Sequence, residues 1–184
     1  ADKYQLPAII LSDLLISDET STIDPELLDM QPVIDRGELI TEVGDEAGDY
    51  ERYKFTDSGI SPRAIPGIPG YEHVVATDEH MPDGVLISDE FTHPHKRRAM
   101  LEKRQRKMDG LLADLPPPAI VGATDAEVTL VGWGSTAGVI QEAIGQLAQA
   151  GVSVNHLHFK WLVPFHADEA VQLLSSCKRT IIVE

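Results

Sequence analysis

The strongest constraint on the fold is the alternation of short apolar runs and helical segments in the last third of the chain. Apolar runs at residues 127–131, 152–159 and 180–183 have the length and composition of buried strands. Helical patterns separate them, at about 136–150 and 167–175. Because short connections between strand, helix and strand give parallel pairs with right-handed crossovers, we predict an α/β fold with a parallel sheet in β-α-β-α-β order.

The preceding residues, 23–118, predict a long irregular connector that carries one helix. Prolines and glycines punctuate this stretch and favour turns, while the apolar residues between them indicate that part of it lies ordered across a surface. A basic helix is expected at about 95–113, with Thr92 as its cap and an apolar stripe along one face. Residues 119–184 then form the folded α/β domain.

Charge is unevenly distributed along the chain, whose net charge is −15. Residues 18–49 carry eleven acids against one base, whereas residues 96–107 carry seven bases against one acid. An acidic total argues against nucleic-acid binding, which depends on a basic footprint, and the basic helix lacks aromatic residues for base stacking. We therefore expect the basic helix to contact an acidic surface, either residues 18–49 or a partner subunit.

Cysteine content and hydropathy favour a cytoplasmic protein. The lone Cys177 can form no internal disulfide and cannot hold an iron–sulfur cluster, which takes about four cysteine ligands. No run approaches the roughly 20 apolar residues of a membrane span, and the first residues lack the pattern of a signal peptide. We expect no membrane association.

The first 22 residues predict a remnant of another domain. Residues 7–13 form an apolar run of the kind buried in a parallel sheet, and the sheet to which it would belong is not recognisable in this sequence. Such a strand is expected to borrow a sheet edge, to be disordered or to dock on a neighbouring chain. Both ends of the chain are expected to be cut points within a longer protein.

Ser61 and Arg63, in the string SPRAIPG, are the candidate substrate- or partner-binding residues. Pro62 and Pro66 fix φ at two points and predict that Arg63 lies on a stiff loop, where its planar guanidinium could hold a carboxylate or phosphate. A dicarboxylate or a diphosphate would suit this cation. The structural alternative, which we favour, is an ion pair that ties the connector to Asp57 or to a partner's acid.

A glycine-rich turn follows the first strand of the predicted sheet. Its Gly-x-Gly pattern resembles a dinucleotide fingerprint, but the third glycine is absent and no acid stands where the ribose hydroxyl would be held. We favour a tight strand-to-helix packing turn, and keep Gly134, Ser135 and Thr136 as a candidate anion turn at the helix N-terminus.

Histidine pairs at 93/95 and 156/158, together with Asp78, Glu79 and His80, invite a metal interpretation. Their spacing does not require that they meet, and no cysteine assists them. We favour polar surface and strand-end histidines, and predict no metal site.

Three strings, YERYKFTDSGISPRAIPGIPG at 50–70, VTLVGWGSTAG at 128–138 and HLHFKWLVPF at 156–165, resemble the alpha subunit of 2-oxoacid:ferredoxin oxidoreductases of the 2-oxoglutarate type. The resemblance covers nearly the whole chain and implies a C-terminal portion whose last domain is transketolase C-terminal-like and truncated. It also implies that residues 7–13 are the last strand of a pyrimidine-binding domain.

The implied reaction of the complete complex is oxidative decarboxylation of a 2-oxoacid with coenzyme A to an acyl-CoA, with electrons passing to ferredoxin. In that family thiamine diphosphate, magnesium and the [4Fe-4S] cluster are held by the beta subunit and the activating glutamate by the N-terminal part of the alpha subunit. No catalytic residue or cofactor ligand is therefore assigned to this chain, which is expected to supply scaffold and subunit contacts and to be inactive alone.

Two alternatives stay open from the sequence. One is an anion- or partner-binding module without an enzymatic role. The other is the C-terminal domain of another thiamine-dependent 2-oxoacid dehydrogenase, which the SPRAIPG string disfavours. The acyl substrate is left open between 2-oxoglutarate, pyruvate and branched-chain acids.

Overall fold

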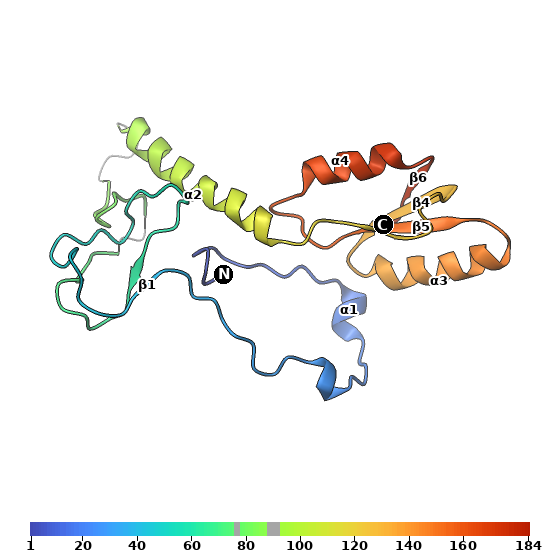
Figure 1. The fold of residues 1–184 in the computed structure, drawn as a ribbon, viewed down its shortest axis with the longest axis horizontal. Helices are drawn as coiled ribbons and strands as arrows, with labels where there is room; N and C mark the ends of the chain where they lie inside the picture. Colours follow the sequence, from blue (N-terminus) through green and yellow to red (C-terminus); the bar gives the residue numbers. More distant parts are fainter. Residues whose placement is uncertain (76–77, 88–92) are drawn as a thin grey trace. The chain divides into compact units, whose positions relative to one another are not determined.

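The computed structural model describes residues 1–75, 78–87 and 93–184, and these divide into two compact units (Figure 1). The connector unit comprises Ala1–Ala8 and Asp29–Leu111. The α/β unit comprises Ile9–Leu28 and Leu112–Glu184. Residues 1–8 thus belong to the connector unit, and residues 9–28 belong to the α/β unit.

The α/β unit is built on a four-stranded sheet with strand order β3-β5-β4-β6. The central strand β4 pairs in parallel with both β5 and β6, so that Leu130 lies opposite His156 on one side and Ile181 on the other. The elements of this unit that form or cover the sheet are β3 (Ile120–Gly122), β4 (Val128–Trp133), α3 (Thr136–Gln149), β5 (Val154–Phe159), α4 (Ala167–Ser176) and β6 (Thr180–Ile182).

Helices α3 and α4 cover opposite faces of this sheet (Figure 1). The chain moves outward from β4 to β5 through α3 and then back across β4 to β6 through α4, and right-handed crossovers in opposite directions place their helices on opposite faces. Leu130, Ile140 and Val154 form the buried core between the sheet and α3. The predicted α/β fold with parallel strand pairs is confirmed.

The sheet is mixed, whereas we expected parallel strands alone. Strand β3 runs antiparallel to β5, with Ile120 opposite Leu157 and Gly122 opposite Asn155. Gly122 has φ +112°, a conformation that favours glycine, and Asn155 Nδ2 donates to the Ala123 carbonyl at 2.8 Å. Three residues are too few to show a periodic pattern, so pairing with β5 decided this strand.

Residues 7–13 form no strand in this structure, so the run does not borrow a sheet edge here. Ile10 is 93% exposed, and the chain continues into α1 (Leu14–Asp18) and a 3-10 turn (Pro25–Leu27). Asp13 caps α1 by accepting from the Ile16 N–H at 3.0 Å. An apolar run becomes a strand only where it pairs with a neighbouring edge, and the described strands pair only with one another.

The connector unit contains helix α2 (Pro94–Asp114), as predicted, and a small parallel pair, β1 (Leu39–Ile40) with β2 (Arg63–Ala64). Arg63 therefore lies in a strand rather than on the expected loop. Thr92, the predicted cap of α2, lies outside the described residues. Gly59, at φ +78°, packs directly against the Lys103 carbonyl of α2, where a β-carbon would collide.

Within the connector unit, no ion pair joins the described part of the basic helix to the acids of residues 29–49. In α2, Arg104 pairs with Glu79 at 2.6 Å. Two of the acids pair elsewhere, Asp35 with Lys3 at 3.5 Å and Glu46 with Lys54. Surface ion pairs are weak and do not decide the fold, so the buried face of the helix, rather than its net charge, sets its neighbours.

No helix among the described residues has the length and apolar character needed to cross a membrane.

Gly132 in β4 offers a test of the packing between sheet and helix. A β-carbon at this position would lie 2.5 Å from Thr136 Oγ1 and 2.6 Å from Ile140 Cδ1. We expect Gly132→Ala to lower the free energy of unfolding by about 1–3 kcal/mol, because overpacking a filled site forces neighbours to move. Denaturant unfolding of the purified chain measures the change.

The matched control is Gly145→Ala in α3, where an added β-carbon meets nothing within 4 Å. We expect this variant to gain about 0.5–1 kcal/mol from the higher helix propensity of alanine. Equal stability of the two variants would contradict the packing role of Gly132.

Candidate functional site

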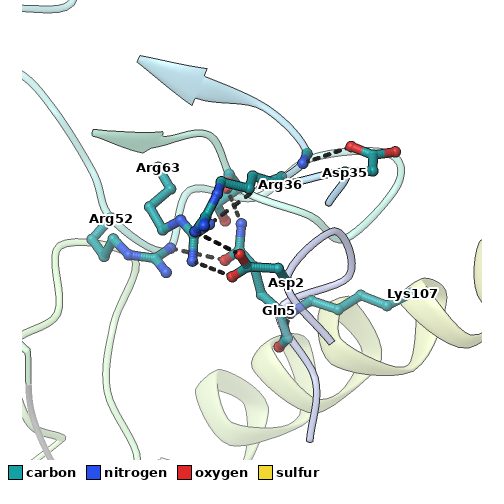
Figure 2. Close-up of polar contacts among 9 residues, drawn as sticks. Asp2, Gln5, Asp35, Arg36, Arg52, Arg63 and Lys107 are labelled. Atoms are coloured by element: carbon teal, nitrogen blue, oxygen red, sulfur yellow. Dashed lines mark hydrogen bonds and ion pairs between the residues drawn. The ribbon is translucent and has the colours of Figure 1, made fainter. Parts of the chain in front are cut away.

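The candidate site is a network of charged side chains around Arg63 in the connector unit (Figure 2). The Asp2 carboxylate accepts from two arginines, from Arg63 Nη1 through Oδ1 and from Arg36 Nη1 through Oδ2, each at 3.1 Å. Arg63 Nη2 also donates to the Arg36 carbonyl at 3.4 Å. The Arg63 side chain keeps 30% of its surface exposed, so its fork is held in place and still faces outward in part.

The backbone around Arg63 is fixed by the β1–β2 pair. The Arg63 N–H donates to the Glu38 carbonyl at 2.9 Å, and the Ile65 N–H donates to that of Ile40 at 3.1 Å. Tyr50 clamps the same segment, because its hydroxyl donates to the Pro62 carbonyl and accepts from the Ala64 N–H. The rigidity expected from the two prolines is supplied by strand pairing as well.

Arg63 pairs with Asp2 rather than with Asp57, the internal acid that we expected. The two arginines share one carboxylate, so the network keeps a surplus of positive charge. Asp2 gave no signal in the sequence, because an acid near the start of the chain belongs to no motif. Its role follows only from the fold, which brings residues 1–8 beside residues 29–111.

Ser61 is buried, with 1% of its surface exposed. Its hydroxyl donates to the Lys54 carbonyl at 2.8 Å, and its own carbonyl accepts from Gln5 Nε2 at 2.7 Å. The Ser61 hydroxyl is thus occupied by the backbone. In this geometry Ser61 holds the loop together, and Arg63 is the member of the string that a ligand could reach.

Gln5 is the polar hub of the network. Its Oε1 accepts from Arg52 Nη1 at 3.0 Å, and its backbone carbonyl accepts from Lys107 Nζ at 3.2 Å (Figure 2). It also has φ +50°, the left-handed region, where non-glycine residues are uncommon. Such strained residues gather at functional sites, where the surrounding structure maintains them.

Two lysines of α2 are buried beside this hub. Lys103 is 3% exposed and Lys107 is 7% exposed. Burial, and after it the positive charges of Lys107 and nearby arginines, lower the pKa of Lys103 to about 8. The pKa of Lys107 is lowered for the same reasons. A lysine whose charge is disfavoured in this way marks a place where an anion would be stabilised.

Neither lysine was predicted to be buried, although the sequence contains a signal for it. They follow Met100 at positions i+3 and i+7, which places them on the apolar stripe of the helix rather than on its solvated face. All three are buried in the structure. Cations on a buried stripe are rare unless paired, and this pattern would have identified them.

The candidate anion turn, Gly134, Ser135 and Thr136, lies at the start of α3. Gly134 has φ +58°, and Thr136 Oγ1 donates to the Trp133 carbonyl at 2.6 Å. The pKa of the Asp13 carboxyl is lowered by the Ile16 N–H and then by Ser135. An internal carboxylate thus already lies near this helix N-terminus, where anions are favoured.

The histidines at 156 and 158 lie on β5 with ring centroids 5.2 Å apart. Burial lowers the pKa of both, and His158 and Lys160 respectively add to the effect. His93 and His95 have ring centroids 5.9 Å apart. Across the described ranges, no three metal-ligating side chains come together in a group that could hold an ion.

These features define an α/β protein with a fixed arginine network on its connector, a geometry suited to holding an anion. The chain matches no protein-family model. It is 30% identical, over 190 residues, to "2-oxoacid:ferredoxin oxidoreductase 1, subunit alpha" of Sulfurisphaera tokodaii. It is 32% identical, over 193 residues, to "2-oxoacid:ferredoxin oxidoreductase 2, subunit alpha" of Aeropyrum pernix. Each alignment covers 100% of this chain and 28% of the relative.

Two further comparisons agree. The chain is 33% identical, over 170 residues, to "2-oxoglutarate oxidoreductase subunit KorA" of Mycobacterium tuberculosis, an alignment that covers 91% of this chain and 24% of the relative. It is similar to a solved 2-oxoglutarate:ferredoxin oxidoreductase from Magnetococcus marinus, with a TM-score of 0.69, 28% identity, and coverage of 87% of this chain and 26% of that one. That protein was solved with 2-oxoglutarate, coenzyme A and succinyl-CoA bound.

The resemblance to this family that we inferred from the sequence motifs is confirmed. From end to end, this chain aligns with part of the alpha subunit of 2-oxoacid:ferredoxin oxidoreductases. It spans about a quarter of the length of the curated relatives that it matches.

The lowered pKa of Lys103 predicts how stability depends on pH. The folded pKa, about 8, lies below the ordinary value of about 10.4, so the unfolded chain binds more protons between these two values and stability rises with pH across this window. Lys103→Met removes the buried charge. We expect this variant to be more stable than the parent by on the order of 2 kcal/mol at pH 7.

This gain should shrink toward zero at pH 10, where Lys103 of the parent is already neutral in the folded state. Denaturant unfolding at the two pH values measures it, and Lys96→Met on the same helix is the control. A Lys103→Met variant that is destabilised equally at both values would show that the charge carries no penalty.

Proposed function

We propose that this chain is part of the alpha subunit of a 2-oxoglutarate:ferredoxin oxidoreductase, in which it supplies scaffold, subunit contacts and an anion-binding arginine. The complete complex would decarboxylate a 2-oxoacid oxidatively, transfer the acyl group to coenzyme A and pass electrons to ferredoxin. The observation that carries this proposal is the alignment of the whole chain with alpha subunits of that activity. The 2-oxoglutarate preference rests on the KorA relative and on the structural neighbour.

Within this proposal Arg63 is the residue that meets the ligand. Its guanidinium is oriented by Asp2 and by the Arg36 carbonyl, and three of its five N–H donors remain for a second acceptor. A carboxylate of the 2-oxoacid, or a phosphate of coenzyme A, would be bound by a planar fork whose direction is fixed before the ligand arrives. Preorganisation of this kind lowers the entropic cost of binding.

Thiamine diphosphate, magnesium and an iron–sulfur cluster are implied for the complete complex, and we assign none of them to residues of this chain. Its single thiol, Cys177, donates to the Leu173 carbonyl, and one cysteine does not fit the ligand set of a cluster. The described residues likewise bring together no group of carboxylates and histidines for a metal ion. In the proposal these groups are held by the beta subunit.

The remaining assignments form part of the same proposal. The α/β unit is transketolase C-terminal-like, with residues 119–184 as the domain, 23–118 as the connector and 1–22 as the remnant of a pyrimidine-binding domain. Gly134, Ser135 and Thr136 form a turn that takes an anion, with the Asp13 carboxylate as its internal occupant. The partner is a beta subunit of the same complex, in the cytoplasm.

Replacement of Arg63 tests the proposed role. In the complete complex we expect Arg63→Lys to lower kcat/KM for the 2-oxoacid or for coenzyme A by at least about tenfold, because a point charge cannot replace a bidentate fork. Steady-state kinetics with each substrate varied in turn shows which of them Arg63 holds.

The control is Arg98→Lys, an exposed arginine of α2 in the same unit, which should leave both kcat/KM values unchanged. Kinetics of Arg63→Lys that equal those of the parent, in a complex assembled to the same extent, would remove Arg63 from the site.

The division of labour within the complex gives a second prediction. The isolated chain should neither bind thiamine diphosphate with magnesium nor decarboxylate 2-oxoglutarate, since those functions lie with other parts of the complex. Calorimetric titration of the chain with magnesium and thiamine diphosphate measures the first, and tight stoichiometric binding would contradict our assignment.

A further inference from the structure

The connector unit holds a second group of cations next to the Arg63 network. We call Arg52, Lys103 and Lys107 the lysine cluster. Lys103 and Lys107 lie on the buried face of α2, and Arg52 comes from the loop before β2. Arg52 and Lys107 both donate to Gln5, the first to its side-chain oxygen and the second to its backbone carbonyl. Figure 2 shows these two cations reaching Gln5 from different elements.

The hydrogen bonds of this cluster are satisfied in part, but its charge is not. Gln5 is neutral. The nearby carboxylates are engaged elsewhere, Asp2 with Arg36 and Arg63 and Glu79 with Arg104. Among the described residues, Lys103 has neither an ion pair nor a side-chain hydrogen bond although 97% of its surface is buried, given its 3% exposure. Burying a lysine side chain without a counter-charge is costly, and a bound anion would offset this cost.

We propose that the lysine cluster is a binding site for a phosphate group, separate from the anion position at Arg63. The two oxygens of Gln5 mark where ligand oxygens would lie, since they already receive the donors of Arg52 and Lys107. A phosphate beside Gln5 would share these donors and add the charge that Gln5 lacks.

A phosphate fits this cluster better than a carboxylate does. The three cations come from a loop and from two positions of a helix, and their charges act on one another, whereas a carboxylate offers two oxygens in one plane. A phosphate carries up to two negative charges near neutral pH and three strong acceptor oxygens, so it can accept from all three donors. The lowered pKa values of Lys103 and Lys107 have the direction expected of a site that lacks its anion.

The test is calorimetric titration of this chain with inorganic pyrophosphate at low ionic strength. We expect saturable binding at one site. Lys103→Met and Lys107→Met should each weaken binding by at least about tenfold, since a hydrogen bond to a charged group is worth about 1.5–3 kcal/mol. Lys96→Met on the same helix is the matched control and should bind as the parent does.

Gln5→Glu gives an independent test that does not depend on removing a cation. The new carboxylate would occupy the position of the ligand and neutralise the cluster from within. We expect this variant to lose pyrophosphate binding and to unfold at a higher denaturant concentration than the parent. Loss of binding together with increased stability cannot arise from misfolding.

Several outcomes would overturn the proposal. The first is the absence of saturable pyrophosphate binding by the parent chain. The second is binding by Lys103→Met and Lys107→Met as tight as that of the parent, and the third is unchanged binding by Gln5→Glu. A parallel titration with ADP identifies the source of the phosphate: tighter binding than pyrophosphate indicates a nucleotide ligand, and equal binding indicates the phosphate alone.

This inference goes beyond the proposed function and does not require it. The Arg63→Lys variant should retain pyrophosphate binding, because Arg63 is paired with Asp2 and lies outside the lysine cluster. Failure of the Arg63 kinetics and failure of phosphate binding are therefore separate results.

Discussion

Two ammonium groups on the buried face of α2 impose the organisation of the connector unit. Lys103 and Lys107 cannot be surrounded by apolar side chains alone, because an unsolvated charge is costly. The segments that pack on this face therefore contact the helix through polar backbone groups. Gln5 presents its carbonyl to Lys107, and the close approach of Gly59 to the Lys103 carbonyl seats the loop before β2 against the helix.

From this arrangement the Arg63 network follows. Once residues 1–8 lie against α2, Asp2 is within reach of both Arg36 and Arg63, and Gln5 is within reach of Arg52 and of the Ser61 carbonyl. Five segments distant in sequence thus meet through hydrogen bonds between side chains and backbone. Because charged hydrogen bonds of this kind are directional, they fix the orientation of Arg63 more narrowly than apolar packing would.

The α/β unit depends on a different constraint, the close packing of α3 on β4. Gly132 allows Thr136 and Ile140 to approach the strand, and Thr136 closes the turn by donating to the Trp133 carbonyl. This geometry accounts for the glycine-rich string as a packing turn. With the Asp13 carboxylate near Ser135, the positive end of the helix is already partly compensated.

The sequence by itself determined the elements whose pattern is periodic. The sequence predicted β4, β5, β6, the helices between them and the basic helix α2 to within a few residues. Elements buried on one face have a regular spacing of apolar residues, which can be recognised locally in the sequence. The string around Arg63 and the family resemblance could likewise be recognised from the sequence, since both depend on motifs of contiguous residues.

Tertiary structure alone decided the partners. Nothing local distinguishes Asp2 from Asp57 as the acid for Arg63, or Gln5 from any other glutamine as a hub, because those contacts join residues more than 45 positions apart. The short strands β1, β2 and β3 exist only through their pairing, whereas the apolar run at 7–13 pairs with none of the described strands. Backbone hydrogen bonds between distant segments, and the burial of charge that they permit, are settled only when the whole unit has formed.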